Sequence, residues 1–181
     1  MQPFYRIIDQ YFKHLNMKRF TIILTVFLIF LVSCEKDSGF GLEIYLLTDY
    51  QTKSTGKEII AGTERLSKSP IIYYHDIIYY DSTNYYFQID TIKAKELNHK
   101  NWATQGTAFS LTINGSIIYS GYFVPGYSSS GVDWFSIDPL SVNSKIYIRL
   151  GYPMDLSKLD NIDPRNDERI LNLLQKDNKL K

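Results

Sequence analysis

The chain has few residues that form covalent or metal cross-links. Its 181 residues include one cysteine and three histidines. A single cysteine excludes a disulfide within the chain, so a folded domain must be held together by its hydrophobic core. Only His75 and His99 follow that cysteine, and neither has a second histidine at ligand spacing. We therefore predict no metal site and no cofactor.

An excess of charge of one sign is also missing. The 20 basic and 19 acidic side chains give a formal net charge of +1. Nothing in this balance indicates a polyacidic partner, so nucleic acid is not expected to bind. A glycine-rich loop that would cradle a phosphate is absent as well.

Long apolar runs are limited to one segment near the start of the chain. Residues 20–32 are almost wholly apolar, which is shorter than the roughly 20 residues that span a bilayer. Lys18 and Arg19 precede this run, and Ser33 and Cys34 follow it, after which the sequence becomes polar. This order predicts a signal peptide over residues 1–33 with a helical apolar segment.

The translation start is expected to lie inside the printed sequence. Met17 directly precedes the basic pair, whereas residues 1–16 are mixed in character and add nothing to the signal pattern. We therefore expect translation to begin at Met17.

Leu31-Val32-Ser33-Cys34 resembles the lipobox of bacterial lipoproteins. The resemblance implies diacylglycerol transfer to the Cys34 sulfur, cleavage before Cys34, and acylation of the freed amine, commonly by palmitate. Only cysteine supplies the nucleophilic sulfur for this step. Two or more acyl chains would hold the protein stably on a membrane.

The residues after the cysteine are similar to the opening of lipoproteins from the Bacteroidota. In that group, acidic residues just after the cysteine direct lipoproteins to the outer face of the outer membrane, and Glu35 and Asp37 match this pattern in part. The resemblance implies a cell-envelope protein, lipid-anchored in the outer membrane, with the leaflet left open. Polar residues 34–41 are expected to form a flexible tether.

Residues 42–181 are predicted to form a single β-rich domain. Short segments rich in β-branched and aromatic residues, several with alternating polarity, indicate strands. Strands are expected over residues 42–47, 71–74, 77–80, 85–89, 108–113, 117–123, 132–137 and 145–150, with a helical turn over 93–97 and residues 58–66 either strand or loose helix. The fold class is therefore mainly β, either a β-sandwich or a small α+β domain.

The clearest local pattern is a hairpin around Asn114-Gly115, a dipeptide that tolerates the positive φ angles of a type I′ turn. A two-residue turn pairs Ile113 with Ser116 and Leu111 with Ile118. That register would place Phe109, Leu111, Ile113, Ile118 and Tyr122 on one face, toward the core.

One C-terminal helix is predicted over about residues 163–176. Asp163 is placed as its N-cap and Pro164 as its first helical residue. Ile170, Leu171 and Leu174 would form its apolar stripe.

Aromatic side chains near loops are the leading candidates for binding. Tyr122, Tyr127, Trp134 and Tyr152 lie in or beside loops that flank predicted strands, with Asp133 as a polar neighbour. Loops on a rigid β scaffold commonly carry recognition, and flat rings suit a sugar or a protein partner. The alternative is that these rings only pack the domain.

A structural subunit of a larger envelope complex is a second possibility. The tyrosine pairs at 73/74, 79/80 and 85/86 put aromatic rings on both faces of their strands, which favours contact with partner chains.

A small serine-type hydrolase is a third reading. It would use the serines at 128–130, Asp133 or His75, but the chain lacks a Gly-x-Ser-x-Gly elbow.

Two short motifs concern modification. Asp81-Ser82-Thr83 and Asp90-Thr91-Ile92 resemble the three-residue O-glycosylation motif of envelope proteins from the Bacteroidota. Ser82 is predicted to lie in a turn and Thr91 at a strand, so Ser82 is the preferred site.

Overall fold

The structure is a computed structural model that describes residues 40–153 and 163–181. The predicted signal peptide, Cys34, nearly all of the predicted tether and residues 154–162 lie outside the described residues. The described residues belong to one compact unit, Ser38–Lys181. Within them, no helix is long and apolar enough to span a bilayer.

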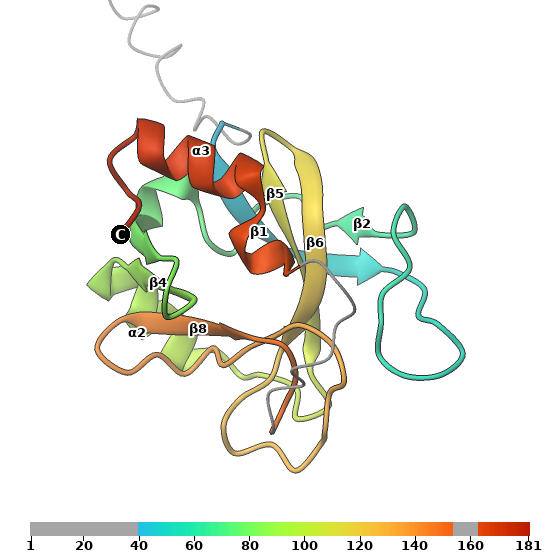
Figure 1. Cartoon of the computed structure of the whole chain (residues 1–181). Helices are drawn as coiled ribbons and strands as arrows, with labels where there is room; N and C mark the ends of the chain where they lie inside the picture. The colour runs from blue at the N-terminus through green and yellow to red at the C-terminus, as the bar shows by residue number, and fades with distance from the viewer. Residues whose placement is uncertain (1–39, 154–162) are drawn as a thin grey trace, which may run out of the picture. The chain divides into compact units, whose positions relative to one another are not determined.

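Eight strands form one mixed sheet in the order β2-β1-β5-β6-β7-β8-β4-β3 (Figure 1). Only the β6–β7 pair is parallel; the other neighbours are antiparallel. The predicted mainly β fold is therefore confirmed, with its strands in a single sheet. The strands are β1 (Leu42–Asp49), β2 (Arg65–Leu66), β3 (Ile77–Asp81), β4 (Tyr86–Ile89), β5 (Thr107–Ile113), β6 (Ser116–Phe123), β7 (Ser136–Ile137) and β8 (Lys145–Arg149).

The C-terminal helix is confirmed, but it begins later than predicted. Asp163 accepts a hydrogen bond from the Arg165 amide and starts only the short 3-10 turn η2 (Pro164–Asn166). Asp167 then adopts a non-helical backbone conformation, and its side chain caps α3 (Glu168–Lys176). Two capping aspartates therefore divide the expected single helix into a turn and a helix.

The predicted helical turn at residues 93–97 is a full helix, α2 (Thr91–His99). The Asp90 side chain accepts hydrogen bonds from the Ile92 and Lys93 amides, at 2.7 and 3.3 Å, and so fixes where the helix begins.

Two predicted strands are much shorter than expected. In the segment 71–74, Ile71 and Ile72 bond to Ile44 as an isolated bridge, and the 3-10 turn η1 (Tyr74–Asp76) follows. The Asp76 carboxylate accepts a hydrogen bond from the Tyr73 amide, which stabilises this turn. In the segment 132–137, only β7 is a strand.

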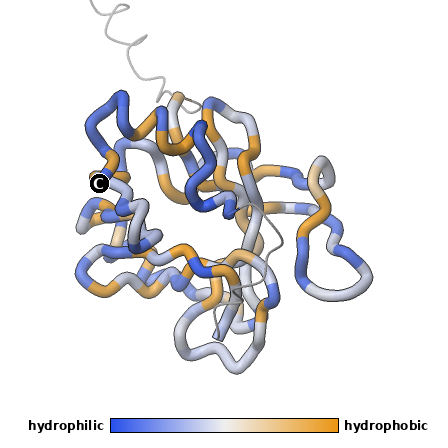
Figure 2. The backbone as a smooth tube through the Cα atoms, in the orientation of Figure 1, coloured by the Kyte–Doolittle hydropathy of each residue, from blue (hydrophilic) through white to orange (hydrophobic). Residues whose placement is uncertain are grey.

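Side chains from distant strands of the sheet meet in one core. Ile44 of β1 and Phe109 of β5 are fully buried in the same cluster as Phe87 of β4 and Ile146 of β8. The sheet must curve for these strands to share a core, and Figure 1 shows β8 running at a steep angle to β5 and β6. α2 and α3 add buried apolar residues to this cluster, namely Ala94, Leu97, Ile170 and Leu174. Hydrophobic and hydrophilic stretches alternate along α3 in Figure 2, as expected for a helix with one buried face.

The hairpin forms, but its predicted register is wrong beyond the turn. Ile113 pairs with Ser116 as expected, whereas Leu111 pairs with Tyr119 because a register shift inserts one extra residue into β6. The insertion reverses the alternation of β6. Tyr119 and Phe123 therefore join Phe109 in the core, and Tyr122 lies opposite Ala108 on the other face.

That other face carries a second, smaller cluster. Ala108 and Tyr122 pack there with Ile59, Val124 and Val132. Ile59 comes from the loop that joins β1 to β2, so this loop folds over the outer face of the β5–β6 hairpin.

Strand β3, at one end of the sheet, pairs with residues far along the chain. The Tyr80 amide donates to the Lys179 carbonyl at 2.7 Å, and the Lys181 amide donates to the Tyr80 carbonyl at 2.8 Å. The C-terminal residues thus cover the edge of β3 with a short parallel bridge.

Candidate functional site

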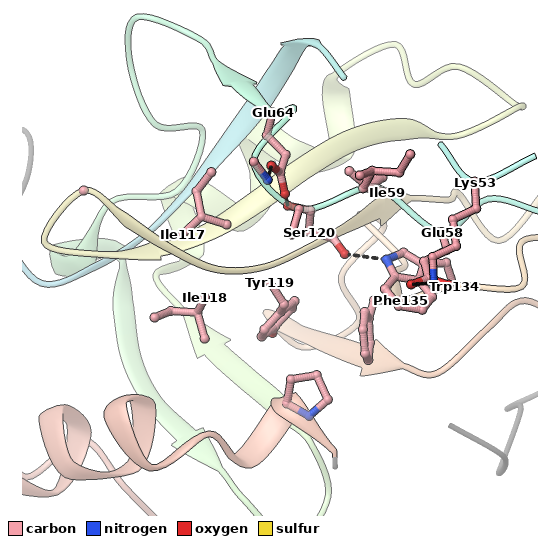
Figure 3. A pocket seen from close by; sticks show the side chains of 15 residues that line it. Lys53, Glu58, Ile59, Glu64, Ile117, Ile118, Tyr119, Ser120, Trp134 and Phe135 are labelled. Atoms are coloured by element: carbon pink, nitrogen blue, oxygen red, sulfur yellow. Dashed lines mark hydrogen bonds and ion pairs between the residues drawn. The ribbon is translucent and has the colours of Figure 1, made fainter. Parts of the chain in front are cut away.

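An open groove of about 1080 Å³ lies beside β6 (Figure 3). One wall is the consecutive β6 residues 117–120. The remaining lining comes from Lys53, residues 58–62 and Glu64 of the β1–β2 loop, from Gly115, from Trp134 and Phe135 before β7, and from Pro164. Most of these side chains are apolar, and three charged groups lie among them.

The β6 strand borders this groove with an edge that has little β pairing. β7 pairs with β6 only at Tyr122 and Phe123. Two residues earlier in β6, the Ser120 carbonyl accepts a hydrogen bond from the Trp134 indole at 2.9 Å. The Tyr122 amide points toward β7, where it donates to the Phe135 carbonyl at 2.9 Å. Because amides two residues apart point the same way in a strand, the Ser120 amide also faces the groove.

The groove has two sets of polar groups, one around Ser120 and one formed by Lys53 and Glu58. The Ser120 hydroxyl donates to Glu64 Oε1 at 3.0 Å and accepts from the Ser110 hydroxyl at 2.6 Å. The other Glu64 oxygen accepts from the Gly62 amide at 2.6 Å. Glu58 forms an ion pair with Lys53 at 2.6 Å. Two carboxylates and one ammonium group therefore leave the groove with one excess negative charge.

The Tyr119 side chain gives the groove an apolar wall. Its hydroxyl is buried and has no hydrogen-bond partner among the described residues. Burial raises the pKa of Tyr119 well above its ordinary value, so the ring stays neutral.

Three of the five binding candidates named from the sequence pack together. Tyr122 is only 2 % exposed and belongs to the outer cluster, against which Trp134 and Tyr152 also pack. The Tyr152 hydroxyl donates to the Gly126 and Ser128 carbonyls at 3.0 and 3.1 Å. Of the three, only Trp134 lines the groove.

The other two residues lie apart from the groove. Asp133 accepts a hydrogen bond from the Lys57 amide at 2.8 Å and so ties the β1–β2 loop to the segment before β7. Tyr127 is 59 % exposed, and its hydroxyl approaches the Trp102 carbonyl at 3.5 Å.

Sequence reasoning did not find the β6 wall, Ile59, Glu64, Phe135 or Pro164 as site residues. The strand pattern of β6 was visible, but the part of its edge that no described strand covers depends on β7 having only two residues. Residues 132–137 looked like a full-length strand, which would have covered that edge.

The residues of the hydrolase reading are not brought together. Ser128 is buried; its hydroxyl donates to the Thr104 carbonyl and accepts from the Ser130 amide. His75 is exposed and stacks on Tyr73 with ring centroids 5.2 Å apart. Within residues 40–153 and 163–181, no contact joins these serines to a histidine, and no group of three or more acidic, histidine or cysteine side chains is placed to hold a metal ion.

The structure changes which glycosylation motif is better exposed. The Ser82 hydroxyl donates to the Lys181 carbonyl at 3.0 Å, whereas Thr91 begins α2, not a strand, and is exposed. We expect any glycan to be on Thr91.

Mass spectrometry of the protein from its native cells should show a mass shift that Thr91→Ala removes and Ser82→Ala retains. A shift that survives Thr91→Ala would contradict this.

Comparison with known proteins gives no family for this chain. No family model, no curated protein sequence and no solved structure matches it. The function is therefore inferred from the residues and their geometry alone.

Proposed function

We propose that this protein is a lipid-anchored lipoprotein of the cell envelope, held in the outer membrane through Cys34, whose domain binds an extended segment of another polypeptide. The observation that carries the binding proposal is the β6 edge at residues 116–121, which lies beside an apolar groove and outside the β6–β7 pairing. The sequence Leu31-Val32-Ser33-Cys34 supports the anchor.

A strand edge to which no described strand pairs favours an extended chain over other ligands. A strand edge presents backbone amides and carbonyls to a second strand. On this edge the Trp134 indole occupies the Ser120 carbonyl, and the Ser120 amide stays directed at the groove. A peptide that adds to such an edge gains main-chain hydrogen bonds, and neighbouring pockets select its alternate side chains. The Ser120 amide, which faces the groove, would donate to a carbonyl of the added segment.

The side chains around the edge define the preferred segment. Ile118, Trp134 and Phe135 offer apolar and aromatic surface for a large apolar residue. Glu64 and Glu58 outnumber the ammonium of Lys53, which favours a basic residue in the segment. The expected ligand is therefore an extended segment with apolar and basic residues on opposite faces. A structural role in an envelope complex would use the same edge.

The test uses short peptides selected from a random display library on the purified full chain in detergent. We expect Ile118→Lys to weaken binding of the selected peptides about tenfold, which corresponds to about 1.4 kcal/mol. The new ammonium group would replace an apolar contact and repel the basic residue of the peptide. Fluorescence anisotropy of labelled peptide measures the affinity.

Two controls separate strand addition from general stickiness. Ile92→Lys changes an isoleucine that is 78 % exposed on α2 and should leave the affinity within twofold of the original. Peptides methylated on alternate backbone nitrogens should lose binding, because they cannot pair with a strand. Hydrogen exchange at residues 116–121 should slow when the unmodified peptide binds. The proposal would be refuted if methylated peptides bound as tightly as unmodified ones, or if Ile118→Lys left the affinity unchanged. It would also be refuted if the groove bound glycans and no peptide.

A further inference from the structure

A second surface, separate from the groove, lies on the outward face of β3, β4 and β8. Tyr79, Tyr86 and Tyr147 form a continuous row of rings across these three strands. The Tyr79 and Tyr86 centroids are 6.0 Å apart, and those of Tyr86 and Tyr147 are 5.2 Å apart. The next side chains along two of the strands, Tyr80 and Phe87, point the opposite way into the core. The row therefore lies on the outer side of these strands, where Tyr147 is exposed and Tyr86 is buried beneath Lys145.

Two lysines lie on these rings. The Lys145 ammonium is 4.4 Å from the Tyr86 centroid, and the Lys181 ammonium is 3.6 Å from the Tyr79 centroid. Neither lysine forms an ion pair with a carboxylate of the described residues. Rings hold both ammonium groups without neutralising them, so their charge remains for a ligand. We call these three tyrosines and two lysines the tyrosine–lysine face.

The carboxylate nearest in sequence to Tyr79 is that of Asp81, and it already accepts hydrogen bonds from the β3–β4 turn. Asp81 Oδ1 accepts hydrogen bonds from the Thr83 and Asn84 amides at 3.1 and 2.8 Å, and Asp81 Oδ2 accepts from the Asn84 side chain at 3.1 Å. This carboxylate stabilises the β3–β4 turn and has no ion pair with Lys145 or Lys181.

The hydroxyl and ammonium groups of the face interact with one another. The Tyr79 and Tyr86 hydroxyl oxygens are 3.3 Å apart. The hydrogen bond with Tyr86 lowers the pKa of Tyr79, and the charges of Lys181 and Lys145 act in the same direction. The hydrogen bond with Tyr86 raises the pKa of Lys145, so that lysine stays protonated at neutral pH.

We propose that the tyrosine–lysine face binds an acidic polysaccharide, through sugar rings that carry carboxylates. Tyr147 is 39 % exposed and offers the ring on which the apolar side of a pyranose would pack. Lys145 and Lys181 would pair with the carboxylates. A ligand with charge alone would leave the exposed Tyr147 ring unused, and a neutral sugar would leave the two ammonium groups unpaired.

The test is titration calorimetry on the purified full chain in detergent with three polymers: polygalacturonate, neutral dextran and dextran sulfate. Polygalacturonate should bind, and dextran should not. Lys145→Gln and Tyr147→Leu should each weaken polygalacturonate binding at least fivefold. Tyr147→Leu keeps an apolar strand residue at an exposed position, so the fold should survive, which urea unfolding checks.

A matched control is Lys100→Gln, because the Lys100 ammonium also lies over a ring, 5.6 Å from the Trp102 centroid. It should change the affinity by less than twofold. Absence of polygalacturonate binding would overturn the proposal. The proposal would also be overturned if dextran sulfate bound at least as tightly as polygalacturonate and Tyr147→Leu had no effect. That result would mean that charge alone determines binding. Peptide binding in the groove should be unchanged in Lys145→Gln, so the two proposals fail separately.

Discussion

Cys34→Ser is expected to leave the precursor uncut and without lipid. The lipid is transferred to a sulfur atom in the pathway that the lipobox resemblance implies, and a serine hydroxyl is far less nucleophilic than a thiolate. Since cleavage follows lipid transfer in that pathway, both steps should fail together. Incorporation of labelled palmitate and the mass of the membrane-bound protein measure the two steps.

The matched control for this variant keeps the small residue before the cysteine. Ser33→Ala should be lipidated and cut normally, because alanine is as small as the serine it replaces. Normal processing of Cys34→Ser would overturn the assignment of the anchor. Loss of processing in both variants would instead point to damage to the signal peptide as a whole.

Gly121→Ala is expected to destabilise the domain by about 3 kcal/mol, because the added methyl group overpacks a crowded site. The methyl would lie 2.5 Å from the Phe135 carbonyl oxygen and 3.0 Å from Phe109 Cζ. The first of these atoms belongs to the backbone and accepts the hydrogen bond from the Tyr122 amide, so it cannot move without straining the β6–β7 pair. Urea unfolding of both forms measures the change in free energy.

Gly131→Ala provides the comparison for this substitution. Its methyl would meet only the Tyr152 carbonyl, at an ordinary contact distance of 3.5 Å. We expect its unfolding free energy to lie within about 0.5 kcal/mol of the original. If Gly121→Ala and Gly131→Ala had equal unfolding free energies, β6 would not approach Phe135 as closely as described.

The sequence predicted the elements whose determinants are local. Asn114-Gly115 identified the hairpin, because the turn depends on two residues. The C-terminal apolar stripe identified α3, because Ile170 and Leu174 are one helical turn apart. The fold class followed from the number of short β-rich segments.

Features that depend on long-range packing were missed. Residues 117–123 contain apolar side chains at both odd and even positions, so alternation alone could not reveal the extra residue in β6. The core decided the register by burying Tyr119 and Phe123. The sequence placed the N-cap at Asp163, whereas in the folded chain the helix begins after Asp167.

The candidate sites show the same limit. Trp134 was identified as an aromatic candidate, but its role in a groove follows from the short β7 and the unpaired part of β6. The tyrosine pairs indicated aromatic rings on both faces. They did not reveal that Lys181, far along the chain, would lie on Tyr79.

The pairing of the C-terminal residues with β3 imposes an order on the folding reaction. The β5–β6 hairpin closes across a two-residue turn, whereas Ser82 and Lys181 bond across 99 positions. Distant contacts form later, because closing a long loop costs more conformational entropy. Until residues 179–181 pair with it, the β3 edge stays exposed, with Ile78 beside it. During that interval the edge is open to pairing with other unfolded chains, which favours aggregation.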